Sequence, residues 1–316
     1  MNAATRLASY GAGLAVLVAG GYTLGQQTGH GDPAAWFTQH SGHTALSTHQ
    51  EGADMNMPSI STGALPQGLA VTENGYTLNV PKTVAAAGKQ TVSFQITDAS
   101  GKPLTDYQKT HEKDLHLIAV RRDFAGFQHV HPRLDTSTGT WSADLDLTPG
   151  TWRVFTDFVP PDGRDTVLGS DVLVPGDPGR QTLPAPSRVA ALDGYTVKVT
   201  GDLVPGHHSM LDFRITKAGR PATNLQPYLG AYGHLVALRE GDLDYLHVHP
   251  SGEPGDGVTQ PGPDIEFGAE VPSPGQYHMF LDFQVDGVVH TAPITLDAKP
   301  DTAAKGAGHP TIRHDH

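Results

Sequence analysis

A short motif, His-Val-His followed by Pro, occurs twice in this chain of 316 residues, at Gln128–Pro132 and Leu246–Pro250. Successive side chains of a β-strand point to opposite faces, so the two histidines of each copy are expected on one face, roughly 6–7 Å apart. Two imidazoles at that separation can bind one metal ion. Proline cannot donate a ladder hydrogen bond, so it is expected to end the strand or lie at an edge.

The sequence around the motif repeats as well. The matched pairs are Asn74–Leu78 with Asp193–Val197, Phe94–Thr97 with Phe213–Thr216, His116–Val120 with His234–Leu238, and Pro149–Trp152 with Pro274–Tyr277. Between turn signals rich in Gly and Pro, short apolar and polar alternations predict about seven or eight strands in each repeat of about 105 residues. This pattern is typical of an antiparallel β-sandwich.

The predicted fold is therefore all-β, with two tandem Ig-like antiparallel β-sandwiches after an N-terminal membrane or signal helix. The sandwiches are expected at 67–175 and 188–297, joined by a Gly/Pro-rich linker at 176–187. The flanking predictions are a signal anchor or signal peptide at 1–27, a disordered linker containing His and Met at 28–66, and a disordered His-containing tail at 298–316.

The segment Leu7–Leu24 is uncharged, mostly small or apolar, and 18 residues long. That length lies between a long signal-peptide core and a short membrane span, so an uncleaved anchor and a cleaved signal both remain open. Arg6 precedes the segment, which predicts export of the rest of the chain. The expected location is extracytoplasmic, either membrane-anchored or secreted.

Composition limits the chemistry. The chain has no cysteine, which excludes disulfides, thiolate metal sites and cysteine catalysis. It has 18 histidines against 21 Lys and Arg, so histidine, carboxylate and methionine are the available metal ligands. The formal charge of −12 argues against nucleic acid as a partner and against a basic membrane-binding surface.

Four positions with metal-binding chemistry agree between the repeats. In the first repeat they are His116, His129, His131 and Asp157, and in the second they are His234, His247, His249 and Asp282. Three imidazoles and a carboxylate suit Cu²⁺ or Zn²⁺, and the carboxylate serves either as a ligand or as the partner that orients an imidazole. Copper is the expected metal and zinc the alternative. A buried hydrogen-bond network of His and Asp is the structural alternative.

Further candidate ligands lie outside these two sets. They are His278, on the same strand face as Asp282, and the linker residues His40, His43, His49, Met55 and Met57. His278 corresponds to Arg153 in the first repeat, so the two sites are not expected to be equivalent. His111, His207, His208 and His290 have no matching histidine and are expected in loops or at the surface.

Each repeat also has an aromatic strand after Pro-Gly and an Asp-Gly turn, at Asp162-Gly163 and Asp286-Gly287. Residues 67–296 resemble the Ig-like sandwiches of the YtkA/FixH-like and CopC-like groups, and with the His-Val-His-Pro motif they resemble exported actinobacterial proteins. The resemblance implies an extracytoplasmic domain that handles metal, often copper. CopC-type sites use the mature N-terminal amine, whereas this chain has a membrane segment and a long linker there.

The leading functional hypothesis is an extracytoplasmic metal-binding protein, copper first, for sequestration, delivery or tolerance, with a metal ion and an unidentified metal-transport protein as partners. The alternative is a non-metal tandem Ig-like interaction or spacer module at the cell surface. A metalloenzyme is not favoured, because no separate general base, nucleophile or phosphate loop is evident beside the histidines.

Overall fold

The computed structural model of the chain describes residues 66–180, 182–246 and 248–300. The predicted N-terminal segment, the linker with His40, His43, His49, Met55 and Met57, the tail from 301 on, His247 and the side chain of His249 lie outside the described residues. No helix within the described part is both long and apolar enough to cross a membrane.

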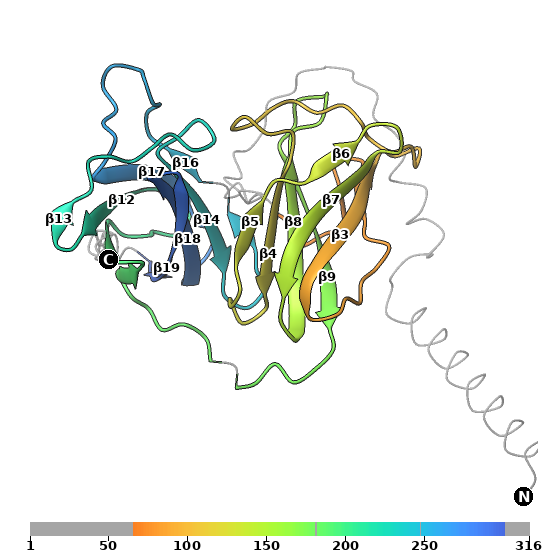
Figure 1. Ribbon diagram of the computed structural model, residues 1–316, viewed down its shortest axis with the longest axis horizontal. Coiled ribbons are helices and arrows are strands. Elements are labelled where there is room, and N and C mark those ends of the chain that lie inside the picture. Colours follow the sequence, from red (N-terminus) through yellow and green to blue (C-terminus); the bar gives the residue numbers. More distant parts are fainter. Residues whose placement is uncertain (1–65, 181, 247, 301–316) are drawn as a thin grey trace, which may run out of the picture. The chain divides into compact units, whose positions relative to one another are not determined.

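The first repeat forms two antiparallel sheets (Figure 1). One sheet has the order β1-β2-β3-β7-β6, and the other has the order β5-β4-β8-β9. The strands are β1 (Thr72–Glu73), β2 (Tyr76–Asn79), β3 (Gly88–Thr97), β4 (His116–Arg121), β5 (Gln128–Val130), β6 (Arg133–Asp135), β7 (Thr140–Leu147), β8 (Gly150–Phe158) and β9 (Thr166–Val174).

The second repeat has the same plan. One sheet runs β10-β11-β12-β17-β16, with β13 paired to β12, and the other runs β15-β14-β18-β19. The strands are β10 (Val189–Leu192), β11 (Tyr195–Thr200), β12 (His208–Lys217), β13 (Arg220–Pro221), β14 (Gly233–Arg239), β15 (Tyr245–Leu246), β16 (His249–Pro250), β17 (Asp264–Glu270), β18 (Gly275–Val285) and β19 (Val288–Ala298).

The prediction of an all-β chain with two tandem sandwiches is confirmed. Each sandwich has its own apolar core, built by alternation along the strands. In β3 the inward residues are Val92, Phe94 and Ile96, and polar residues separate them. In β12 the corresponding inward set is Leu211, Phe213 and Ile215. This period of two is what a strand with one buried face requires.

Strands β4 and β14 depart from this alternation because both of their faces are buried. On β4, Leu117 belongs to the core of the first repeat, while Ile118 and Val120 point the other way into a third apolar cluster. We call this cluster the seam. It consists of Ile118, Val120, Phe124, Phe155, Val167, Val236, Leu238, Leu243, Tyr245 and Phe280.

The seam contains residues of both repeats, so the two sandwiches share one buried apolar layer. Phe127 stacks on Phe280 across it, with ring centroids 4.0 Å apart. Hydrogen bonds also cross it. The Gln67 amide donates to Asp244 Oδ1 (2.8 Å), and the Tyr245 hydroxyl donates to Asp157 Oδ2 (3.0 Å).

Candidate metal centre at the seam

The His-Val-His-Pro motif is the place where the chain passes from one sheet of a sandwich to the other. In the first repeat, β5 pairs with β4 and ends at Val130, and β6 then pairs with β7 of the opposite sheet. The second copy makes the same passage, since β15 pairs with β14 and β16 pairs with β17. Proline after the second histidine suits this change of sheet because it needs no ladder hydrogen bond.

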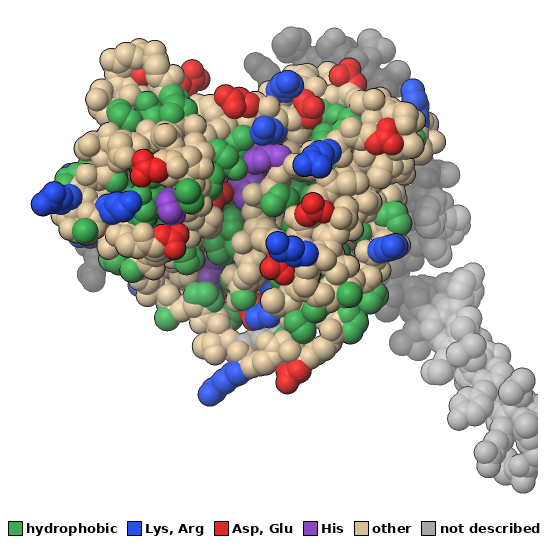
Figure 2. Space-filling view, in the orientation of Figure 1, with side chains coloured by type: hydrophobic (Ala, Val, Ile, Leu, Met, Phe, Trp, Pro, Cys, Tyr) green, Lys and Arg blue, Asp and Glu red, His purple; other side chains and the backbone are tan. Residues whose placement is uncertain are grey.

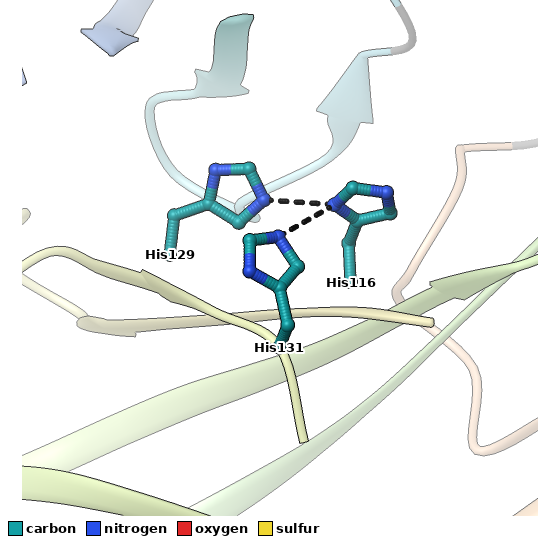
Figure 3. A group of neighbouring side chains, drawn as sticks. All are labelled: His116, His129 and His131. Atoms are coloured by element: carbon teal, nitrogen blue, oxygen red, sulfur yellow. Dashed lines mark hydrogen bonds between the residues drawn. The ribbon is translucent and has the colours of Figure 1, made fainter. Parts of the chain in front are cut away.

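Three histidines of the first repeat lie together at this passage (Figure 3). His116 begins β4, His129 is the central residue of β5, and His131 follows the end of β5. One ring nitrogen of each lies within 4.8 Å of the other two. His116 Nδ1 is 3.0 Å from His129 Nε2 and 3.2 Å from His131 Nε2. We call these residues the histidine triad.

The outer nitrogens of two triad rings have partners that fix their tautomers. His116 Nε2 lies 3.0 Å from the carbonyl oxygen of Thr110, which only accepts, so we assign the ring proton to Nε2. His129 Nδ1 lies 2.9 Å from a carboxylate oxygen of Asp282, so we assign its proton to Nδ1. A neutral imidazole carries one N–H, and therefore His116 Nδ1 and His129 Nε2 both present lone pairs.

Those two lone pairs face each other at 3.0 Å. Two acceptors at that distance repel unless a proton or a metal ion lies between them. Zinc bonds to imidazole nitrogen of 2.0–2.1 Å in a tetrahedral site place the nitrogens roughly 3.3 Å apart. The nitrogen separations of 3.0 and 3.2 Å in the triad are close to that value. Three imidazole nitrogens gathered in this way could hold one metal ion.

Burial disfavours the charged form of two of the three triad rings. His116 is 7% exposed, and burial, followed by the neighbouring His129, lowers its pKa to about 4. Burial also lowers the pKa of His131 to about 3, with His129 and His116 contributing. On the face shown in Figure 2, histidine side chains lie beside hydrophobic ones. Near neutral pH these two rings are uncharged, which is the state that binds a metal ion.

The second repeat supplies an equivalent of His116. His234 begins the seam-facing side of β14, and its Nε2–H donates to the carbonyl oxygen of Tyr228 (2.8 Å), six residues earlier, as His116 does to Thr110. Burial lowers the pKa of His234 to about 4. A cavity of about 40 Å³ has both His116 and His234 in its wall, enough space for a water molecule or an ion.

One histidine at this cavity, His111, lies in a turn, which agrees with the predicted loop or surface position. His111 lines the cavity, with its ring centroid 5.0 Å from that of His234 and 6.1 Å from that of His116. Because the second repeat has no matching histidine, comparison of the two copies gives no signal for it. Its position beside Thr110, the partner of His116, is the feature that brings it here.

Asp157 and Asp282 each form a hydrogen bond with a residue of the other repeat. In the strand register, Asp157 lies opposite His116 and Asp282 lies opposite His234, as expected from the matched sequences. Yet Asp282 binds His129 of the first repeat, and Asp157 accepts from Tyr245 of the second. The arrangement is reciprocal across the seam, whereas the sequence placed each carboxylate with the histidines of its own repeat.

His278 does not join this group. It lies four residues from Asp282 along β18, roughly 13 Å at 3.3 Å per residue. Its Nε2–H donates to Glu240 (2.8 Å), the Thr295 hydroxyl lies 3.0 Å from Nδ1, and the ring stacks on Phe124 at 3.7 Å. Both ring nitrogens of His278 thus have partners outside the histidine triad, and its accessory ligand role stays a prediction.

The sequence profile of a family described as "Domain of unknown function (DUF8832)" matches residues 70–175 and 190–300. None of the curated proteins matches the sequence. The family description does not name the YtkA/FixH-like or CopC-like groups, so that resemblance remains a prediction.

Solved structures with similar folds are distant. The fibronectin(III)-like modules of Clostridium thermocellum CbhA are 13% identical, with 76% of this chain and 100% of that chain covered and a TM-score of 0.20. The D00-D0 domain of intimin is 11% identical, with 71% and 99% covered and a TM-score of 0.20. The Yersinia pseudotuberculosis adhesin InvE is 14% identical, with 70% of this chain covered and a TM-score of 0.22, and the match spans 58% of the adhesin chain.

Proposed function

This chain belongs to the family described as domain of unknown function DUF8832, and from that premise we propose that its two repeats act as one extracytoplasmic interaction or spacer module. The observation that carries the proposal is the seam. Ile118, Phe155 and Phe280 are each at most 5% exposed and are buried against the other repeat. Domains joined only by a linker move independently, whereas a shared apolar layer holds them at one fixed angle. The uncharged segment Leu7–Leu24 supports export.

Residual dipolar couplings of the full chain test the rigid module. Couplings from the two repeats are expected to fit one alignment tensor. The variant Ile118→Asp places a charge in the seam and serves as the uncoupled control, which is expected to need two tensors. Two tensors for the unaltered chain would contradict the proposal. Protease added to intact cells is expected to digest the repeats, and protection until lysis would contradict the extracytoplasmic location.

The histidine triad favours a second candidate function, binding of one transition-metal ion. Its support is the convergence of three imidazole nitrogens with two tautomers fixed by outer partners. Copper is the proposed metal because Cu²⁺ binds such nitrogen sites more tightly than Zn²⁺ at equal availability, and zinc is the alternative. A site that is largely buried suits sequestration or delivery of the ion.

Titration of the full chain with Cu²⁺ and with Zn²⁺, in competition with a chelator, tests this candidate. The double variant His129→Ala with His131→Ala is expected to lose one tightly held ion. The matched control is His207→Ala with His208→Ala, which removes two exposed histidines from the second repeat and is expected to retain that ion. Equal stoichiometry in the triad variant and the unaltered chain would overturn metal binding by the triad.

A further inference from the structure

The outer partner of His129 comes from the other repeat. His129 Nδ1 donates to Asp282 Oδ2 at 2.9 Å, and the two side chains are 5% and 4% exposed. Asp282 is itself held from within its own repeat, because the Thr291 hydroxyl on β19 donates to Oδ1. A buried carboxylate is therefore positioned by the second repeat and directed at a ligand of the first.

A carboxylate in this position acts on the imidazole in two ways. It fixes the ring proton on Nδ1, so that the Nε2 lone pair points into the triad, and it makes that lone pair more basic. The corresponding partner of His116 is the Thr110 carbonyl, which belongs to the first repeat. Of these two outer partners, the charged one crosses the seam.

We infer that binding of a transition-metal ion by the triad and docking of the two repeats are coupled, with Asp282 as the positioning residue that links them. The inference rests on the metal-binding candidate. When the seam opens, His129 loses its carboxylate and the triad binds the ion less tightly. By thermodynamic reciprocity, the bound ion stabilises the docked arrangement by the same factor. The bound ion thus also stabilises the two-repeat module.

The chain offers a matched control for Asp282. Asp244 is a buried carboxylate of the second repeat, 2% exposed, and it also accepts a hydrogen bond from across the seam. Its cross-seam partner is the backbone amide of Gln67, whereas that of Asp282 is a triad imidazole. Asp244→Asn and Asp282→Asn therefore each remove one buried carboxylate at the seam, and of the two changes Asp282→Asn is the one that touches the outer nitrogen of a triad ligand.

The first measurement is Zn²⁺ and Cu²⁺ affinity of the full chain. Asp282→Asn is expected to weaken binding by about 10–100-fold, the usual effect of removing a partner of a ligating histidine, and Asp244→Asn by less than about 3-fold. Equal affinities for the two variants would overturn the inference while leaving metal binding in place. If these variants and the triad variant all keep the metal affinity of the unaltered chain, both the coupling inference and the metal-binding candidate are overturned.

The second measurement reports docking directly. The Tyr245 amide donates to the Gln67 carbonyl across the seam (3.1 Å), so its hydrogen exchange requires the seam to open. Saturating Zn²⁺ is expected to slow this exchange by about 10–100-fold, the same factor as the affinity change. In Asp282→Asn, measured at a Zn²⁺ concentration that saturates this variant, Zn²⁺ is expected to leave the Tyr245 exchange rate nearly unchanged, a factor of about 1. Undiminished slowing in that variant would overturn the inference.

Should Asp282→Asn fail to fold, Thr291→Val provides the second test. It leaves the carboxylate and removes the hydroxyl that holds it. It is expected to weaken both the Zn²⁺ affinity and the slowing of Tyr245 exchange, in the same proportion. A change in one without the other would count against the coupling.

Discussion

The seam can be tested with two substitutions on neighbouring residues of one strand. Leu117 and Ile118 are adjacent on β4, have the same number of carbons and are 1% and 0% exposed. Leu117 faces the core of its own repeat, and Ile118 faces the seam. Truncation to alanine removes three carbon groups from each, about 2.4 kcal/mol of transfer free energy, and the cavity that remains raises the total to about 3–4 kcal/mol.

If the two repeats unfold together, Ile118→Ala is expected to lower the free energy of unfolding as much as Leu117→Ala does. If the repeats are independent, Ile118 would be exposed in a separated repeat, and its truncation would change the free energy of unfolding by less than about 0.5 kcal/mol. Urea unfolding with a chelator present measures both, followed by the fluorescence of Trp141 and Trp152, which lie in the first core. A normal loss for Leu117→Ala with almost none for Ile118→Ala would refute the role assigned to the seam.

Two further predictions concern acid stability and strand packing. In the metal-free chain, His116 and His234 are neutral when folded because burial lowers their pKa to about 4, while the unfolded chain takes up these protons near pH 6.5. Their contribution to the free energy of unfolding is complete above pH 6.5 and is lost as the pH falls toward 4, by up to about 3 kcal/mol per histidine. Urea unfolding at pH 7 and pH 5 would measure this loss, and equal stability at the two pH values would contradict the prediction. Gly169→Ala is expected to destabilise the fold by about 1–3 kcal/mol, since the added carbon meets the Gly68 carbonyl and the Arg153 guanidinium. A thermal melt beside Ser170→Ala checks this, and equal melting temperatures for the two variants would refute it.

Much of each sandwich could be predicted from local patterns. The alternation of Val92, Phe94 and Ile96 with polar residues is enough to predict a strand with one inward face, as β3 has. Agreement between the repeats also selected His116, His129 and His131, which lie together in the triad. These features depend on strand periodicity and on one short connection, which the order of residues largely determines.

The sequence carries a weaker signal for the seam. Strand alternation shows which faces are buried but does not show which surface covers them. Residues 116–120 and 234–238 read His-Leu-Ile-Ala-Val and His-Leu-Val-Ala-Leu, apolar runs with no polar face after the histidine. Such runs are typical of strands buried on both faces. They indicate that something covers the outer face of β4 and β14, and they do not say that each covers the other.

Sequence by itself determined the two sandwiches, their repeated plan and the choice of residues with metal-binding chemistry. Tertiary structure alone decided which repeat each carboxylate serves, bringing Asp282 to His129, Tyr245 to Asp157 and His111 to the cavity beside His234. The reason is physical: side-chain direction follows from the period of a strand, whereas the pairing of two apolar faces follows from their shape. Contacts between residues as distant as 129 and 282 depend on that pairing and leave no mark in local spacing.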